Sequence, residues 1–458
     1  MDSYDVVIVG GGAGAKLIWG SVPGRSVAVV EQSRVGGDCP FVACVPSKAM
    51  LRTAQVWHTV GTDQWSGLFS GRVDSERAYE EAVRRRDRIV HGRDDSLNAE
   101  GLESTGATLL RGEGTIVEPG VVDVSGTEIG YGEIVLNTGS VPSRPDIPGL
   151  ESVPVWTSDE ALSTSTYPSS AVIIGGGPVG CELAFLFATF GTAVTLVQRG
   201  ARLVPKEEPE TSSALQNLLL TRGVDVRVNA RVVEMESVGA GAHATLGDAS
   251  AVDADVVILA AGRHPRSQGL GLDRLGVALT AKGAVPIDER CRVRGADHVW
   301  AVGDVTGTAP FTHTAHYQGR VVAANLSGRD VLTDYRAVPR AVYTDPVFVS
   351  VGHTVASARA VDIDPMVARA SMSQVVRSST EGESDGWLTL LADPSTGTVI
   401  GASASGGHAE EWISEVSLLI RARIPVQVAI DVVHPFPTFG EILEGPLWEL
   451  AARLDNQV

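Results

Sequence analysis

Two cysteines five positions apart, Cys39 and Cys44, are the residues of this chain best suited to redox chemistry. A pair with this spacing at the start of a helix can close a disulfide. The helix dipole also lowers the pKa of a thiolate there. Lys48 adds a positive charge one turn further along. The pattern therefore predicts a thiol pair that accepts electrons and passes them on.

A metal site is the alternative interpretation of this pair, because thiolates also bind soft metal ions. The chain has no second cysteine or histidine pair with ligand spacing, so redox chemistry is favoured and no bound metal is expected. The other two cysteines, Cys181 and Cys291, are expected to be buried and inert. Four cysteines in 458 residues do not make a framework of structural disulfides.

The elements that would bring electrons to the pair are visible as an internal repeat. Residues 5–9 form an apolar run that leads into a glycine turn, a helical stretch and a second apolar run at 27–31; residues 171–199 repeat this order. Each copy is the opening of a dinucleotide-binding fold, in which glycines permit a tight turn and the helix N-terminus faces a pyrophosphate. The turn residues expected to bind are Gly10, Gly12, Ala13 and Gly14 in the first copy and Gly175, Gly177, Val179 and Gly180 in the second. Two copies predict two different nucleotides with a redox reaction between them.

The residues that end the two copies differ, and they predict which nucleotide each copy binds. Glu31 lies 21 positions after Gly10, where a carboxylate can bind the ribose hydroxyls. The second copy has Gln198 and Arg199 at this point, with Arg202 three residues later. Guanidinium groups there can hold a 2′-phosphate, which favours NADPH and leaves NADH as the alternative. The alternative interpretation is that these arginines are merely exposed on the surface and bind no phosphate.

Length and charge limit what else the chain can be. With 458 residues it should divide into about three domains. The net charge of −18 makes nucleic acid and anionic membranes poor partners. No apolar run reaches the roughly 18 residues of a membrane span, and the N-terminus lacks the basic start of a signal peptide. We therefore expect a cytoplasmic protein.

Coarse secondary structure follows from the same patterns. The first fingerprint helix should be about two residues shorter than the second, because Pro23 and Gly24 end it early. Residues 75–110 predict one long charged helix followed by a strand. Residues 255–263 predict a buried strand, and the chain after Arg336 becomes rich in strands and then helical.

Seven motifs, in order, resemble the class I pyridine nucleotide–disulfide oxidoreductases, which include glutathione reductase, dihydrolipoamide dehydrogenase and mercuric reductase. They are the Cys39–Cys44 box ending in Pro46-Ser47-Lys48, Thr138-Gly139-Ser140, the second fingerprint with Glu182, Gly262-Arg263-His264-Pro265, Trp300-Ala301-Val302-Gly303-Asp304-Val305, Tyr343-Thr344-Asp345-Pro346 with Ser350-Val351-Gly352, and Pro437-Thr438 with Glu441. The resemblance covers essentially the whole chain.

This resemblance implies an α/β fold with two Rossmann-like domains, one for FAD and one for NAD(P), and a C-terminal α+β dimerisation domain. The expected boundaries are 1–150 for the first part of the FAD domain, 151–268 for the NAD(P) domain, 269–335 for the second part of the FAD domain, and 336–458 for the dimerisation domain. It also implies a homodimer in which each subunit completes the active site of the other.

The resemblance also implies roles for single residues. Lys48 and Glu182 would pair beside the flavin, Cys44 would contact the flavin, and Cys39 would meet the substrate. The residues expected to bind FAD are Gly10, Gly12, Ala13, Gly14, Glu31, Gly37, Asp38, Lys48, Gly114, Thr138, Gly139, Ser140, Gly303 and Asp304. Those expected to bind NAD(P)H are Gly175, Gly177, Val179, Gly180, Glu182, Gln198, Arg199, Arg202 and Gly262.

One departure from the family concerns catalysis. The disulfide reductases carry His-x-His-Pro-Thr-x-x-Glu, and alignment on Pro437 and Glu441 places Phe436 at the catalytic histidine. A placed histidine contributes about 10²–10⁴-fold through acid–base catalysis. Turnover of glutathione disulfide, mycothiol disulfide or dihydrolipoamide is therefore expected to be poor. His434, two residues or about 7 Å away along an extended chain, is the candidate substitute.

A phenylalanine at this position also occurs in 2-ketopropyl coenzyme M oxidoreductase/carboxylase, whose Cys-Pro-x-x-Ala-Cys-Val-Pro box is similar to residues 39–46. The likeness is partial, because this chain keeps Ser47, Lys48 and Glu441. It also has no cysteine after Cys291, and therefore no C-terminal pair of the mercuric reductase kind.

The leading hypothesis is an FAD-dependent oxidoreductase that moves electrons from NADPH through Cys39 and Cys44 to a small acceptor. The acceptor would be a disulfide or, because it should need little protonation, a metal ion, a quinone or an activated sulfur compound. Reductive cleavage of a C–S bond is the second hypothesis. A weakly active flavoprotein that serves as a redox sensor is the third, and the intact Cys39, Cys44, Lys48 and Glu182 argue against it.

Overall fold

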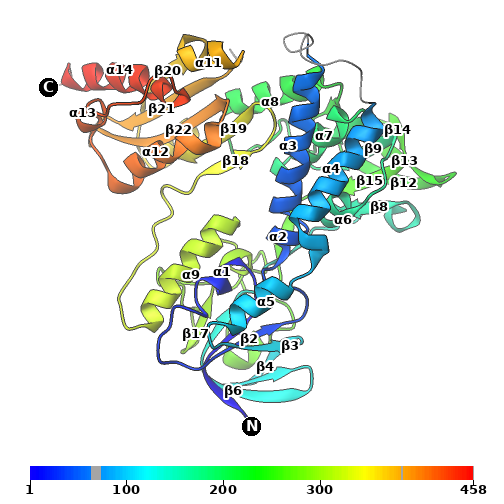
Figure 1. Ribbon diagram of the computed structural model, residues 1–458, viewed down its shortest axis with the longest axis vertical. Coiled ribbons are helices and arrows are strands. Elements are labelled where there is room, and N and C mark those ends of the chain that lie inside the picture. The colour runs from blue at the N-terminus through cyan, green and yellow to red at the C-terminus, as the bar shows by residue number, and fades with distance from the viewer. Residues whose placement is uncertain (63–73, 383–384, 457–458) are drawn as a thin grey trace. The chain divides into compact units, whose positions relative to one another are not determined.

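The computed structural model describes residues 1–62, 74–382 and 385–456 (Figure 1). The chain forms two compact units. The first consists of Met1–Ser47, Arg84–Ser143 and Gly262–Asp334, and the second of Lys48–Val83, Arg144–Ala261 and Tyr335–Val458. Each unit contains one copy of the repeated fingerprint.

The main sheet of the first unit has the strand order β3-β2-β1-β6-β5-β4, with β17 beside β6. Its strands are β1 (Ser3–Val9), β2 (Val27–Glu31), β3 (Thr108–Arg111), β4 (Gly114–Glu118), β5 (Val121–Val124), β6 (Thr127–Leu136) and β17 (Val299–Ala301). Strand β1 runs parallel to both β2 and β6, and its residues Val6–Val9 are buried. A parallel strand covered on both faces needs such a continuous apolar run.

The first fingerprint forms the predicted strand, turn and strand, but its helix is much shorter than expected. Helix α1 spans only Ala13–Lys16, whereas its counterpart α7 spans Pro178–Thr189. Helix α7 has Pro178 in its first turn, a favourable position, and a nearly all-apolar sequence that is buried. The chain after Lys16 contains Gly20, Pro23 and Gly24 and continues in turns. In Figure 1, α1 lies beside α9 (Thr312–Leu326).

The long helix predicted over residues 75–110 is wrong, because two helices and a short turn occupy this stretch. Helix α4 spans Ser75–Ile89 and α5 spans Ser96–Glu103, and strand β3 follows as predicted. Between the helices, His91, Gly92 and Arg93 all have positive φ. Such backbone cannot continue a right-handed helix.

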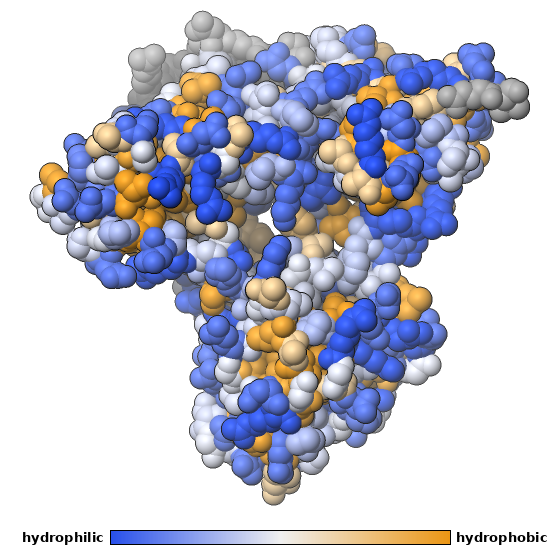
Figure 2. Space-filling model, turned by 180° about the vertical axis from the view of Figure 1, so that it is seen from behind, coloured by the Kyte–Doolittle hydropathy of each residue, from blue (hydrophilic) through white to orange (hydrophobic). Residues whose placement is uncertain are grey.

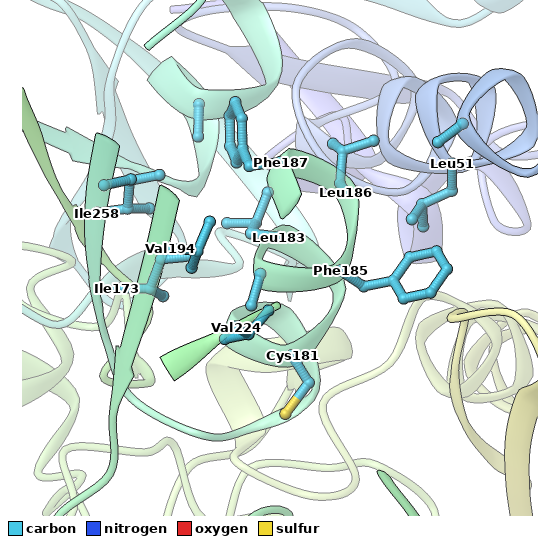
Figure 3. Packing of buried hydrophobic residues seen from close by; sticks show 14 of the residues in the cluster. Leu51, Ile173, Cys181, Leu183, Phe185, Leu186, Phe187, Val194, Val224 and Ile258 are labelled. Atoms are coloured by element: carbon cyan, nitrogen blue, oxygen red, sulfur yellow. The ribbon is translucent and has the colours of Figure 1, made fainter. Parts of the chain in front are cut away.

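The five-stranded sheet that contains the second fingerprint has the order β11-β10-β9-β15-β8 and is parallel throughout. Its elements are β8 (Val155–Thr157), α6 (Ser158–Ser163), β9 (Ser170–Ile174), α7, β10 (Ala193–Val197), α8 (Pro209–Thr221), β11 (Asp225–Arg227) and β15 (Val256–Leu259). The buried strand predicted over 255–263 is β15, which ends before Gly262 turns the chain at φ +107°. In Figure 3, α7 lies between the strands that carry Ile173 and Ile258 and the helix α3 (Cys44–Val60), which carries Leu51.

The C-terminal part is rich in strands and then helical, as predicted. Its antiparallel sheet has the order β18-β19-β22-β21-β20. The elements are β18 (Arg340–Val342), β19 (Val347–Gly352), α10 (Val355–Arg359), β20 (Met366–Ser371), α11 (Val376–Glu381), β21 (Trp387–Asp393), β22 (Thr398–Gly406), α12 (Ala409–Ala422), α13 (Val426–Ala429) and α14 (Glu444–Asp455). Three short antiparallel strands, β12 (Val232–Val238), β13 (Gly241–Leu246) and β14 (Ala251–Ala254), form a separate sheet in the same unit.

Figure 2 shows a face dominated by hydrophilic side chains, with apolar side chains gathered in separate patches. In the parts of the chain that the structure describes, no helix combines the length and the apolar character needed to cross a membrane.

Candidate active site

The two cysteines, expected together at one helix start, lie near the starts of two separate helices. Cys39 is in the short helix α2 (Asp38–Phe41), and Cys44 is the first residue of α3. Between them, Phe41 and Val42 are buried and anchor the connecting turn in the core. The side chains of both cysteines remain partly accessible. The turn thus presents the sulfur atoms while its apolar residues hold it in place.

The hydroxyl group of Thr312 interacts with both sulfur atoms. Thr312 Oγ1 lies 3.4 Å from Cys44 Sγ, and the same side chain hydrogen-bonds to Cys39. A hydrogen bond that the Cys39 thiol donates to Cys44, together with burial, raises the pKa of Cys39, whereas the Thr312 hydroxyl acts in the opposite direction. Thr312 is also the first residue of α9. Two helix N-termini therefore meet at Cys44, where their partial positive charges favour a thiolate.

Sequence reasoning missed Thr312, because no pattern marks it apart from its position eight residues after Asp304. It also gave no role to Arg263. The Arg263 guanidinium donates to Asp38 Oδ2 at 2.8 Å and to Ser140 Oγ at 2.7 Å. Ser140 in turn donates to Asp304 Oδ2 at 2.6 Å. Arg263 therefore connects Asp38 with Ser140 and, through Ser140, with Asp304; all three are expected at the FAD site. The bond to Asp38 also holds the residue that precedes Cys39.

The first fingerprint has the geometry of a nucleotide site. Gly10 adopts φ +98°, and a Cβ atom there would lie 2.4 Å from the carbonyl oxygen of Asn137. Only glycine combines this conformation with so close an approach. Glu31 is buried and accepts hydrogen bonds from the N–H groups of Gly11 and Ser33. The residues present therefore fit a dinucleotide, with the Glu31 carboxylate at the end of β2 where the ribose would lie.

Other residues expected at the FAD site have mixed surroundings. Gly37 and Gly139 have positive φ, and Gly303 donates its N–H to Gln318 Oε1 at 2.6 Å. Thr138 donates its hydroxyl to the Arg266 carbonyl. Gly114 begins β4, where a Cβ atom would lie 3.0 Å from a side-chain carbon of Val9. These positions lie in the first unit, and their contacts with the cofactor stay predictions.

Lys48 and Glu182 meet in the second unit as predicted. The Lys48 ammonium donates to Glu182 Oε2 at 2.8 Å and lies 4.3 Å from the centre of the Tyr343 ring. The other Glu182 oxygen accepts the Tyr343 N–H at 3.0 Å. Glu182 is 8% exposed and therefore holds a nearly buried charge next to its counter-ion. Tyr343, which lies within a motif named above, had no predicted role of its own.

The second fingerprint repeats the geometry of the first. Gly175 has φ +115°, and a Cβ atom there would lie 2.3 Å from the carbonyl oxygen of Ala260. Gly180 packs against the Gly175 carbonyl, whereas the space beside Gly177 is open. Val179, in the first turn of α7, is exposed. The turn therefore leaves room for a pyrophosphate at the helix N-terminus.

The three residues expected to select the nucleotide have different surroundings. Gln198 Oε1 accepts the N–H of Gly176 at 3.1 Å, as Glu31 accepts that of Gly11 in the first copy. Arg199 is exposed. Arg202 instead donates to the carbonyl oxygens of Pro205 and Glu207 within its own loop and to the hydroxyl of Ser212 in α8.

The segment that departs from the family motif lies in the second unit. Phe436 is 72% exposed, and the Glu441 carboxylate accepts the N–H of Thr438 as part of a helix cap. The His434 ring hydrogen-bonds through Nδ1 to Glu444 and through Nε2 to Glu415. Both nitrogens of the candidate substitute histidine are therefore engaged by carboxylates.

Cys181 and Cys291 are buried, and burial raises the pKa of the Cys181 thiol. This agrees with the expected inert role. Among the described residues, no group of three or more histidine, cysteine or acidic side chains could hold a metal ion.

Comparison with known proteins identifies the family. Residues 4–319 match the pyridine nucleotide-disulphide oxidoreductase family, and residues 338–446 match its dimerisation domain. Mercuric reductase from Streptomyces lividans is 33% identical over 460 residues, which cover 96% of this chain and 95% of the relative. Dihydrolipoyl dehydrogenase from Thermus scotoductus is 31% identical, with 100% of this chain and 98% of the relative covered.

Among solved structures, the Cu(II) complex of the HOCl-induced flavoprotein disulfide reductase RclA from Escherichia coli is similar. Its TM-score is 0.87 at 27% identity, and the alignment covers 98% of this chain and 100% of that one. The chain therefore belongs to the class I pyridine nucleotide–disulfide oxidoreductases, flavoprotein enzymes that use FAD and NAD(P)H.

Proposed function

We propose that this enzyme reduces a thiophilic metal ion, with NADPH as the electron source and Cys39 and Cys44 as the groups that bind the ion. The observation that carries the proposal is Phe436, an apolar and exposed side chain at the position where the disulfide reductases carry their catalytic histidine.

The need for a proton distinguishes a disulfide acceptor from a metal acceptor. Reduction of a disulfide releases a thiolate that must be protonated, and a placed histidine accelerates that step by about 10²–10⁴-fold. Phe436 has no proton to give. The ring nitrogens of His434 are engaged by Glu415 and Glu444, and Glu441 caps its own turn. A metal ion makes no such demand, because thiols lose their protons when they bind it.

The residues of the chain have distinct tasks in this scheme. Arg199 holds the 2′-phosphate of NADPH, and the N-terminus of α7 faces the pyrophosphate. When bound, FAD supplies the two-electron link between the nicotinamide and the cysteine pair. Opening the Cys39–Cys44 disulfide takes two electrons and leaves two sulfur groups, to which the Thr312 hydroxyl can donate. A divalent ion then replaces the thiol protons and is reduced by two further electrons from a second NADPH.

Two relatives support this choice of acceptor. One is a mercuric reductase, and the structure of the other, RclA, is a Cu(II) complex. Residues 292–458 contain no cysteine, so the proposal has the ion bind directly to Cys39. Small thiol-bound complexes of the ion would suit this direct route.

Anaerobic NADPH oxidation tests the proposal. Mercuric ion buffered by a small thiol should accelerate oxidation by wild-type protein, and glutathione disulfide or lipoamide should be much poorer acceptors. Cys39→Ser and Cys44→Ser should abolish the metal-dependent rate while NADPH still reduces the flavin, which serves as the internal control. Full metal-dependent activity in Cys39→Ser, or faster turnover of a disulfide than of mercuric ion, would falsify the proposal.

Reductive C–S cleavage is the second candidate, because an apolar Phe436 would also protect a carbanion from protons. The distinguishing assay supplies a 2-ketoalkyl thioether with NADPH under nitrogen. Release of the ketone and the free thiol, together with no response to mercuric ion, would favour this candidate over metal reduction.

We also propose that the enzyme acts as a homodimer through its C-terminal domain, as its dimerisation-domain match suggests. Large apolar side chains of this domain are exposed in the isolated chain, among them Val433 at 92% and Trp448 at 58%. Light scattering after gel filtration should give twice the mass of 48.0 kDa. A monomer at micromolar concentration would contradict this assembly.

A further inference from the structure

The loop between β10 and α8, residues 198–208, carries Arg199, the residue proposed above to hold the 2′-phosphate. The loop packs directly on the phosphate-binding turn. A Cβ atom on Gly176 would lie 2.5 Å from Leu203 Cδ2, and the N–H of Val204 donates to the Gly176 carbonyl at 2.8 Å. Gln198 bridges the turn and the loop, because its side chain also donates to the Arg202 carbonyl.

Within the loop, Arg202 closes the chain on itself through the carbonyl oxygens of Pro205 and Glu207. Val204 has φ +37°, an unfavourable conformation for a β-branched residue. Such a conformation persists only where the surrounding contacts impose it. The loop therefore depends on being held at its ends, and its inner end is held by Gly176.

The outer end is held by the C-terminal domain. Arg340 donates to both carboxylate oxygens of Glu207, at 2.8 and 3.1 Å, and Ser350 donates its hydroxyl to the same group. Arg340 and Ser350 are directly opposed residues of β18 and β19, so one cross-strand pair binds the Glu207 carboxylate. The side chains of Glu207 and Arg340 are only 12% and 26% exposed. Bidentate, partly buried pairs of this kind are directional.

We propose that Glu207 is a positioning residue for recognition of the 2′-phosphate, so that the C-terminal domain helps to set the preference of the nucleotide-binding domain for NADPH. The proposal rests on the proposed use of NADPH. Glu207 does not touch the nucleotide in this scheme; it keeps the loop, and with it Arg199, in the binding geometry. Small displacements of a binding group are costly when its partner must be met at a defined distance.

The test measures binding of 2′-phospho-ADP and of ADP, which differ only in the 2′-phosphate, to the FAD-loaded enzyme by calorimetry. The variants are Arg199→Gln, Glu207→Gln, Arg340→Gln and the control Glu210→Gln. Glu210 lies just beyond the loop and pairs with Arg369, but both side chains are largely exposed, at 40% and 62%. Exposed ion pairs contribute little to stability, so this control removes a neighbouring carboxylate but leaves the Glu207–Arg340 pair intact.

Wild-type protein should prefer the 2′-phosphorylated ligand, and Arg199→Gln should lose about tenfold in that preference. Glu207→Gln and Arg340→Gln should each lose about three- to tenfold, with ADP affinity within about twofold of wild type. The double variant should be no worse than either single variant, because the two residues form one interaction. Glu210→Gln should match wild type. With NADPH as substrate, Glu207→Gln and Arg340→Gln should raise KM and leave kcat unchanged.

Two failures are distinguishable. If wild-type protein shows no preference for the 2′-phosphate, the proposed use of NADPH is wrong, and the positioning role of Glu207 fails with it. If wild type shows the preference and Arg199→Gln removes it, but Glu207→Gln retains it in full, NADPH recognition stands and the role of Glu207 is overturned. An equal loss of affinity for ADP and for 2′-phospho-ADP in Glu207→Gln would also overturn it, since that result indicates a general structural role.

Discussion

Lys48 and Glu182 form a 2.8 Å ion pair although 134 positions separate them in the sequence. The side chain of Glu182 is 10% exposed, whereas that of Lys48 is 36% exposed. The carboxylate is therefore the partner that depends more on the pair. A buried charge that loses its counter-ion destabilises a protein more than the loss of the weak net attraction alone would suggest.

This asymmetry predicts different outcomes for the two partners. Lys48→Met should lower the free energy of unfolding by about 1–3 kcal/mol, because Glu182 keeps its charge and retains the Tyr343 N–H as partner. Glu182→Gln should cost less, because its amide oxygen can still accept that N–H. Denaturant unfolding of the FAD-saturated protein measures both. Equal losses would contradict the dependence of Glu182 on Lys48.

The loss of a proton donor at position 436 predicts a gain-of-function variant. Phe436→His should raise turnover of small disulfides by about tenfold or more, because acid–base catalysis by histidine contributes about 10²–10⁴-fold. The metal-dependent rate should not rise. Phe436→Leu is the control, since it changes the shape without adding an acid. If the histidine variant reduces disulfides no faster than wild type, another feature limits that reaction.

The cysteine pair predicts a pH dependence of alkylation. The hydrogen bond that the Cys39 thiol donates to Cys44 raises the pKa of Cys39, so Cys39 of the reduced protein should stay protonated to higher pH than an ordinary thiol. Only the thiolate reacts with iodoacetamide. Cys44→Ala should therefore shift the pH profile of Cys39 alkylation to lower pH and raise the rate at pH 8. Mass spectrometry of the alkylated peptide gives the rates.

Thr312 supplies the matched control, because its hydroxyl lowers the pKa of Cys39. Adding Thr312→Val to the Cys44→Ala variant should move the profile back to higher pH. A shift in the same direction for both substitutions would show that general loosening of the site, rather than hydrogen bonding, governs the thiol.

The glycine turn of the first unit predicts a stability difference between two glycines that both have positive φ. A Cβ atom at Gly10 would lie 2.4 Å from a backbone carbonyl oxygen, whereas Gly24 has nothing within 4 Å. Gly24→Ala should cost only the conformational penalty, about 1 kcal/mol. Gly10→Ala adds a clash with backbone that cannot move aside, and should lower the thermal midpoint further and weaken FAD retention. Identical midpoints would contradict the close packing at Gly10.

Much of the site follows from local patterns. The strand and glycine turn of each fingerprint, and the helix starts at Cys39 and Cys44, depend on apolar runs and glycine positions that act over a few residues. The helix after the first turn shows the limit of such reasoning: α1 ends at Lys16, while the more apolar α7 continues to Thr189. Gly20, Pro23 and Gly24 all lie beyond Lys16, so the positions of these residues alone do not set where α1 ends.

The sequence by itself determined the chemistry available to this protein: a thiol pair at a helix start, two nucleotide turns, and a phenylalanine where a proton donor would act. Only the tertiary structure decided what single polar side chains do with it. The Arg202 guanidinium hydrogen-bonds to its own loop, Glu441 caps a turn, and the Thr312 hydroxyl interacts with both sulfur atoms. Motifs are read from spacing along the chain, but a hydrogen bond is made with whichever partner folding brings within about 3 Å.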